Sequence, residues 1–189
     1  NAAENVVLSY ALAKAERVKS AQYYQLFDSV WYDRLGVNPK EREYYFGLIQ
    51  RDLSFKPTVL AYCAIAEAMD QAAFTGWITF DSAKTHGLLF ATPRGPMAIL
   101  WDRTDGYVLT EKIENFATPE PWIDTWKTKV EIALPAAGKQ VTVTNCIGQK
   151  KEEVAENGNV LLTLDGAPRI VYGLDTKRLG LVLSGAEGL

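Results

Sequence analysis

The chain has 189 residues, of which 48% are hydrophobic and 23% are charged, values typical of a folded globular protein. This composition excludes a disordered, collagen-like or coiled-coil architecture. Twenty basic and 23 acidic side chains give a net charge of −3, which offers no basic surface for nucleic acid or an anionic membrane. No apolar run approaches the roughly 20 residues of a membrane-spanning helix, and the first residues do not resemble a signal peptide.

The first third of the chain shows a helix, a strand, a loop and a second helix, the order of an α/β unit. A capping pattern and an apolar stripe that ends at Val18 predict a helix over residues 1–20. The aromatic run 23–27 predicts a buried strand. A polar loop over residues 31–45 follows, and Pro57 then begins the second helix.

From residue 74 onward, the sequence consists of short β-rich segments separated by turn residues. Seven segments without an intervening helix predict an antiparallel β-sandwich, namely 74–80, 87–91, 97–101, 130–134, 141–145, 160–164 and 169–172. Residues 179–183 form either a last strand or a frayed tail. The interval 103–129 is expected to cross the surface. Within it, Trp122 and Trp126 could form an exposed aromatic platform for a glycan, but an anchor onto the N-terminal part is favoured. We therefore expect an α+β fold class with two domains, 1–72 and 73–189.

The two cysteines and the single histidine do not indicate a particular catalytic or metal site. Cys63, Cys146 and His86 are too few and too scattered for a zinc site, so we expect no metal and no cofactor. Cys63 falls on the apolar stripe of the second helix and Cys146 follows a strand, so both thiols are expected to be buried. A disulfide between them, and a thiol-protease dyad with His86, stay open as alternatives. Nucleotide-binding, serine hydrolase and zinc peptidase motifs are missing from the sequence.

Three short motifs, FGL at 46–48, RD at 51–52 and KP at 56–57, precede an alanine-rich helix. They resemble the last strand, last loop and last helix of retaining (β/α)₈-barrel glycoside hydrolases. The segments GPMAILW, VEIALP…KQVTVTNCIGQ and NVLLTLDGAPRIVYG resemble the β-sandwich that often follows the barrel in these enzymes. The resemblance implies the terminal βα unit of a TIM barrel followed by an antiparallel β-sandwich. A whole barrel needs about 250 residues, so both catalytic carboxylates are expected upstream of this chain and none within it.

Candidate substrate-binding residues lie in and before the polar loop. Asp28 ends the predicted strand, where a barrel delivers side chains to its catalytic face. Trp31 and Tyr32 offer aromatic faces for stacking on a pyranose. Glu43 is a loop carboxylate that could form a carboxylate pair with Asp33. Each group also has a structural alternative: the aspartate caps its own loop, the aromatic rings plug the core, and the charged residues are solvated.

These patterns predict the C-terminal portion of a glycoside hydrolase that cleaves O-glycosidic bonds. The expected partners are an oligo- or polysaccharide substrate and a missing barrel segment, present as upstream sequence or as a second chain. One alternative is a non-catalytic β-sandwich module that binds carbohydrate or another partner. Another is an assembly protein whose N-terminal segment completes a partner's sheet. The sequence leaves localisation open, and the resemblance alone favours an extracytoplasmic or secreted protein.

Overall fold

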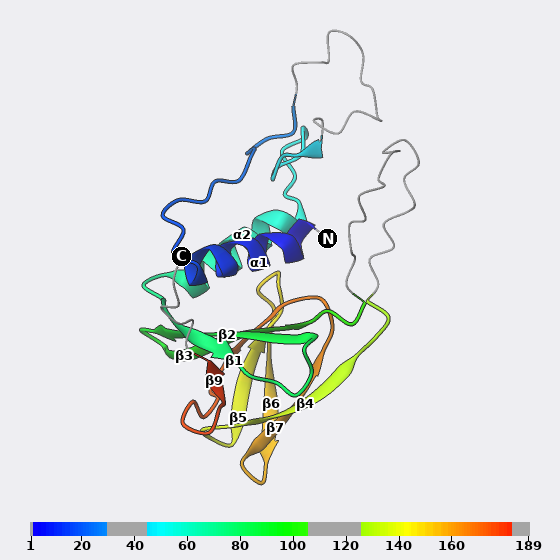
Figure 1. The fold of residues 1–189 in the computed structure, drawn as a ribbon. Helices are drawn as coiled ribbons and strands as arrows, with labels where there is room; N and C mark the ends of the chain where they lie inside the picture. Colours follow the sequence, from blue (N-terminus) through cyan, green and yellow to red (C-terminus); the bar gives the residue numbers. More distant parts are fainter. Residues whose placement is uncertain (1, 30–44, 106–125, 183–189) are drawn as a thin grey trace.

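The computed structural model describes residues 2–29, 45–105 and 126–182 (Figure 1). The described residues form two helices and a nine-stranded sheet with the order β4-β7-β6-β5-β8-β3-β2-β1-β9. The elements are α1 (Ala2–Ala15), α2 (Pro57–Met69), β1 (Ala73–Ile78), β2 (Thr85–Thr92), β3 (Gly95–Asp102), β4 (Val130–Pro135), β5 (Gln140–Thr144), β6 (Lys150–Glu156), β7 (Asn159–Leu164), β8 (Arg169–Tyr172) and β9 (Leu181–Val182). All strand pairs within the sheet are antiparallel. No helix in these ranges is long and apolar enough to cross a membrane.

The sheet curls on itself (Figure 1). Side chains from strands near its two ends belong to one buried cluster on the concave side. We call this cluster the inner core. It includes Ile78 of β1, Leu134 of β4, Val160 of β7 and Val171 of β8. Strands that alternate side chains between two faces can fill such a concave interior with every second residue. The result is a curled half-barrel of one continuous sheet.

The convex face of the sheet is also apolar, and the two helices cover it. On β3, Met97, Ile99 and Trp101 point to this face, whereas Ala98 and Leu100 belong to the inner core. Small and branched residues of the helices complete the second cluster, the outer core, namely Ala3, Val6, Val7, Ala11 and Ala15 of α1 with Ala61, Ile65 and Ala68 of α2. Figure 1 shows both helices lying across the sheet. The division into domains 1–72 and 73–189 stays a prediction.

The predicted α+β class is confirmed, and all seven predicted strands are present within two residues at each end. In place of the two separate sheets of a sandwich, the structure has one curled sheet. The open segment 179–183 contains β9. Strand β6, Lys150–Glu156, was not predicted, because its residues KKEEVAE are mostly charged and every residue of the strand is exposed or half-buried.

Helix α1 ends at Ala15, five residues before the predicted end. The N–H of Val18 donates to the carbonyl of Ala13 at 2.8 Å, and the N–H of Arg17 donates to the carbonyl of Lys14 at 3.2 Å. With Arg17 at φ 55°, these bonds form a Schellman cap that stops the helix. Val18, predicted to end the apolar stripe, is therefore exposed.

Helix α2 begins at Pro57 as predicted, but its buried face lies one position before the predicted apolar stripe of Val59, Tyr62, Cys63, Ala66 and Met69. Its buried residues are Thr58, Ala61, Ile65 and Ala68. Cys63 is exposed, so the prediction of a buried thiol is wrong for this residue. In a helix with alanine at so many positions, the hydrophobic pattern does not select one face sharply.

A side chain from the sheet caps the end of α2. Arg94, in the turn between β2 and β3, donates to the carbonyl of Glu67 at 3.0 Å and to its carboxylate at 2.7 Å. The guanidinium also lies 5.3 Å from the ring centroid of Tyr172. A cation near a helix C-terminus is favourable, and α2 has no basic residue of its own in its last turn. The β2–β3 turn thereby fixes α2 on the outer face.

A substitution at Gly87 of β2 tests the close packing of the inner core. A Cβ at this position would lie 2.8 Å from Cδ2 of Leu100 and 3.1 Å from Cβ of Ile78. We expect Gly87→Ala to lower the free energy of unfolding by about 2 kcal/mol through overpacking. Chemical denaturation measures this loss.

The matched control is Gly138→Ala, because no atom lies within 4 Å of the Cβ it would add. We expect this substitution to change stability by less than about 0.5 kcal/mol. Equal stability of the two variants would contradict the described packing around Gly87.

Candidate functional site

Two short segments of the N-terminal part run side by side in the same direction. Phe27 and Ile49 form a parallel bridge. The N–H of Asp28 donates to the carbonyl of Ile49 at 2.9 Å, and the N–H of Ile49 donates to the carbonyl of Leu26 at 2.9 Å. We call residues 25–28 and 48–50 the parallel pair. The predicted strand 23–27 is not formed as a continuous strand, and only the bridge at Phe27 is present in this range.

Asp28 lies at the end of the first segment and holds three parts of the chain together. Its Oδ1 accepts a hydrogen bond from the N–H of Gly47 at 2.9 Å and forms an ion pair with Nζ of Lys56 at 2.6 Å. Lys56 Nζ also donates to the carbonyl of Tyr45 at 2.9 Å. Asp28 is only 6% exposed, so the carboxylate at the centre of this network is buried, whereas Lys56 is partly exposed. Burial, with the Asp28 carboxylate as a smaller cause, raises the pKa of nearby Tyr23.

Glycine is required at position 47 for this arrangement. A Cβ there would lie 2.1 Å from the backbone nitrogen of Asp28 and 2.3 Å from the carbonyl carbon of Phe27. Real Cβ atoms do not approach backbone so closely, so any other residue would push the two segments apart. Gly47 and Lys56 belong to the FGL and KP motifs of the sequence, but their contacts with Asp28 were not predicted. Their separation from it, 19 and 28 residues, leaves no local pattern to detect.

Most of the other predicted site residues lie outside the described residues. Trp31, Tyr32, Asp33 and Glu43 belong to residues 30–44, and Trp122 belongs to 106–125. The structure therefore leaves their predicted roles as predictions. Asp28 is the one substrate-binding candidate that it describes.

Trp126 links the sheet to the first helix. Its Nε1 donates to Oε2 of Glu4 in α1 at 3.3 Å. Its ring lies against Gly166, where a Cβ would come within 2.4 Å of three ring atoms. Trp126 thus contacts the N-terminal part, as expected of an anchor.

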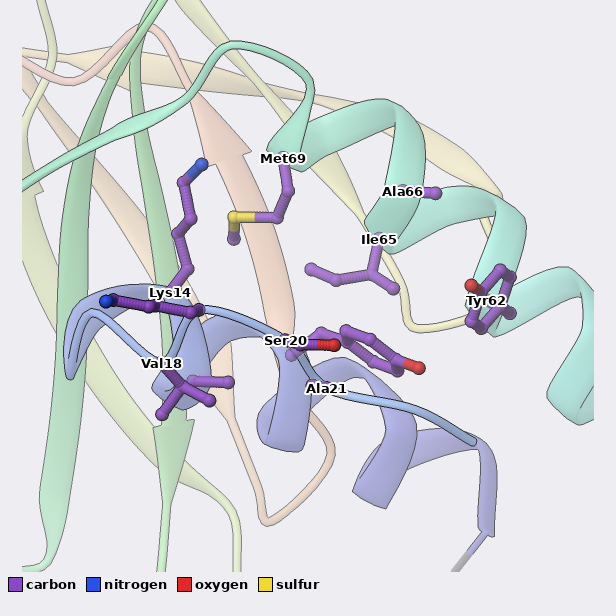
Figure 2. Close-up of a pocket in the computed structure, with 11 residues that line it drawn as sticks. Lys14, Val18, Ser20, Ala21, Tyr62, Ile65, Ala66 and Met69 are labelled. Atoms are coloured by element: carbon purple, nitrogen blue, oxygen red, sulfur yellow. The ribbon is translucent and has the colours of Figure 1, made fainter. Parts of the chain in front are cut away.

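A hollow of about 180 Å³ lies between α1 and α2 (Figure 2). Tyr10, Val18, Tyr62 and Met69 are among its lining residues, and Lys14 adds a positive charge. Tyr10 and Tyr62 pack edge to face with ring centroids 5.4 Å apart. No Asp or Glu lines this hollow, so it does not supply the carboxylate pair that glycoside hydrolysis needs.

His86 packs in an aromatic cluster on the convex face of the sheet. It stacks on Trp101 with ring centroids 5.3 Å apart, and Trp77 lies 6.3 Å from Trp101. Burial raises the pKa of the Cys146 thiol, which disfavours the thiolate that a protease dyad with His86 would require. Both cysteines are free. Among the described residues, no three His, Cys, Asp or Glu side chains gather as metal ligands would.

Comparison with known proteins gives a similarity to a solved structure. No protein-family model matches the chain, and no curated protein matches it. The solved structure of a family 39 glycoside hydrolase from the gut symbiont Bacteroides cellulosilyticus WH2 is similar, with a TM-score of 0.60 and 17% sequence identity. The similarity covers 90% of this chain and 30% of that chain. The chain thus has a distant glycoside hydrolase-like fold and spans under a third of the length of the protein it matches.

We expect the ion pair of Asp28 to stabilise the N-terminal part of the chain. Asp28→Ala removes the carboxylate that Gly47 and Lys56 bind, and we expect it to lower the free energy of unfolding by about 2 kcal/mol. Asp28→Asn keeps an acceptor for the N–H of Gly47, so its loss should be smaller, about 1 kcal/mol. Urea denaturation of the two variants measures both values, and wild-type stability of Asp28→Ala would contradict this role.

Stability should also depend on the protonation of His86. Burial and the charge of Arg103 lower its pKa below the ordinary value of 6.5, whereas Asp102 raises it by a smaller amount. The unfolded chain therefore binds the proton more readily than the folded chain, so the free energy of unfolding falls as pH falls from about 7 toward 5. This loss begins near the unfolded pKa and is complete below the pKa of the folded state.

The variant His86→Phe keeps an aromatic ring against Trp101 and removes the titrating group. We expect its stability to vary less with pH than that of the wild type between about pH 5 and 7. Thermal unfolding at several pH values in this range measures the difference. An identical pH dependence in both proteins would exclude His86 as its source.

Proposed function

We propose that this chain is the C-terminal portion of a glycoside hydrolase that cleaves O-glycosidic bonds. The observation that supports this function best is the similarity to the family 39 glycoside hydrolase over 90% of the chain. The parallel pair between two helices adds a second argument, because parallel strands followed by helices are the units of a (β/α)₈ barrel. In this proposal, α1, the parallel pair and α2 are the end of the barrel, and the curled sheet is the domain that follows it.

The reaction requires two carboxyl groups that flank the scissile glycosidic bond. In a retaining enzyme one protonates the leaving oxygen and the other attacks the anomeric carbon, through an oxocarbenium-like transition state. We propose that polypeptide upstream of this chain supplies this pair, and that the substrate is an oligo- or polysaccharide. The 189 residues then contribute the wall of the sugar site and the support for it.

Within this chain, Asp28 is the proposed contact to a sugar hydroxyl. Its Oδ1 is occupied by Gly47 and Lys56, which fix the orientation of the carboxylate. No hydrogen bond to Oδ2 is present within the described ranges, so this oxygen is the acceptor proposed for the substrate. The residues that follow it in the chain, Trp31, Tyr32 and Glu43, are proposed to line the same site, with the aromatic rings stacking on the sugar.

The test is an activity measurement on the protein purified from its native source and identified by peptides of this sequence. We expect hydrolysis of at least one member of a panel of 4-nitrophenyl glycosides and oligosaccharides, and no hydrolysis by the isolated 189-residue chain. If the native protein hydrolyses none of them while the isolated chain binds a glycan in calorimetry, the carbohydrate-binding alternative replaces the proposal.

A further inference from the structure

Large apolar side chains surround the parallel pair and face solvent. We call these seven residues the apolar patch: Tyr24, Leu26, Phe27, Tyr45, Phe46, Leu53 and Phe55. Their exposed fractions range from 42% to 71%. The segments that hold them are joined by backbone hydrogen bonds, including those from Ile49 to Leu26 and from Gln50 to Ser54, so these side chains gather around the parallel pair. Successive residues such as Leu26 and Phe27 lie on its opposite faces, so apolar side chains are exposed on both. Exposed apolar side chains gathered in this way mark an interaction site.

The exposure is specific to this part of the molecule. Ten of the twelve large apolar side chains that are exposed in the described ranges lie before residue 63. The described residues of the sheet and its connections contribute only Val154 and Leu161. Within the described ranges, the curled sheet therefore buries most of its apolar side chains, whereas the N-terminal part exposes many of its own.

The backbone of the parallel pair is incomplete in the same place. The carbonyl of Leu26 and the N–H of Asp28 both bond Ile49. Because successive residues of a strand direct these groups to opposite edges, the N–H and carbonyl of Phe27 point away from residues 48–50. No backbone partner for them lies among the described residues. Parallel strands are almost always buried on both faces, so a free edge beside exposed aromatic rings calls for a further strand.

We propose that the apolar patch and the free edge at Phe27 are the docking surface for an additional apolar β-strand that runs parallel to residues 25–28. This inference rests on the proposed function, because the strand would belong to the barrel polypeptide that supplies the carboxylate pair. The extent of the similarity supports this occupant. At most about 19 of the 189 residues lie outside the match to the family 39 enzyme, so most of the N-terminal part lies within it, and 70% of that larger chain is left over.

Two other occupants fit the surface less well. A sugar would stack on the aromatic rings, but it would leave the aliphatic side chains of Leu26 and Leu53 and the backbone edge of Phe27 uncovered. A second copy of this chain would bring an equally short segment that forms a single bridge, which is too short to complete a parallel sheet. An additional strand would bond the backbone groups of Phe27 and also contact the apolar patch.

The experiment compares the native protein with the isolated 189-residue chain by intact mass and hydrogen exchange. We expect the native sequence in a longer chain or a tight complex, with exchange at residues 24–28 at least tenfold slower than in the isolated chain. Exchange across Lys150–Glu156, in β6, should be equal in both. A native species of 21.0 kDa without a partner, a dimer of that species, or unchanged exchange at residues 24–28 would each overturn the inference.

Paired substitutions separate docking from simple misfolding. Tyr24→Lys with Leu26→Lys should leave the isolated chain folded, because both side chains are exposed there, and should destabilise the native species. The control pair, Val154→Lys with Leu161→Lys, changes equally exposed residues of the sheet and should leave both unchanged. If the patch pair unfolds the isolated chain as well, the patch belongs to the chain's own core and the inference fails.

The outcomes also separate this inference from the proposed function. A larger native species with protected residues 24–28 but without glycosidase activity would retain the docking surface and reject the hydrolase. A lone 21.0 kDa chain with glycosidase activity would reject the docking surface and locate the carboxylate pair within these 189 residues.

Discussion

Apolar side chains on both faces of the central strands are the constraint on which the rest of the fold depends. Strands β2, β3 and β8 bury residues toward the interior and toward the helices alike, so neither face tolerates water. The sheet buries its concave face by curling on itself, which brings β4 and β7 over that side. The two helices bury its convex face. Without α1 and α2, side chains such as Phe90 and Ile99 would be exposed, at a cost of about 2 kcal/mol for each.

The parallel pair is stabilised in the opposite way. It is too short to bury its own apolar residues, and polar contacts fix its geometry instead. One carboxylate oxygen of Asp28 holds the backbone of Gly47 and the ammonium of Lys56, and Lys56 stands directly before the first turn of α2. A nearly buried ion pair contributes more to specific geometry than to stability, because desolvation offsets much of its Coulomb energy. The segments are therefore held in register while their apolar side chains face outward.

The sequence was informative wherever structure followed from local periodicity. The strands of the sheet alternate apolar residues or form apolar runs between turn residues, so their positions and the α+β class could be predicted. β6 could not, because a strand with solvent on most of its surface has no apolar period to detect. The buried face of α2 was misplaced by one position, since its alanines make several faces nearly equivalent.

Contacts between distant residues were beyond the sequence for a different reason. Two such contacts are the bridge between Phe27 and Ile49 and the ion pair of Asp28 with Lys56. The length of the intervening segment does not determine which residues it brings into contact. Asp28 could be selected as the polar end of a strand, but not the groups that bind it. Trp126 was different, because a tryptophan in a long polar connection is conspicuous, and its contact with Glu4 fits that expectation.

The turn between β2 and β3 has a further consequence for how the protein can vary. Thr92 pairs with Gly95, so only Pro93 and Arg94 form the loop, and surface loops of this kind usually accept inserted residues. Here the guanidinium of Arg94 must reach the carbonyl of Glu67 at 3.0 Å. One additional residue would rotate the arginine away from the helix end. This turn is therefore a fixed-length spacer between sheet and helix, and related chains should keep its length even where its other residues differ.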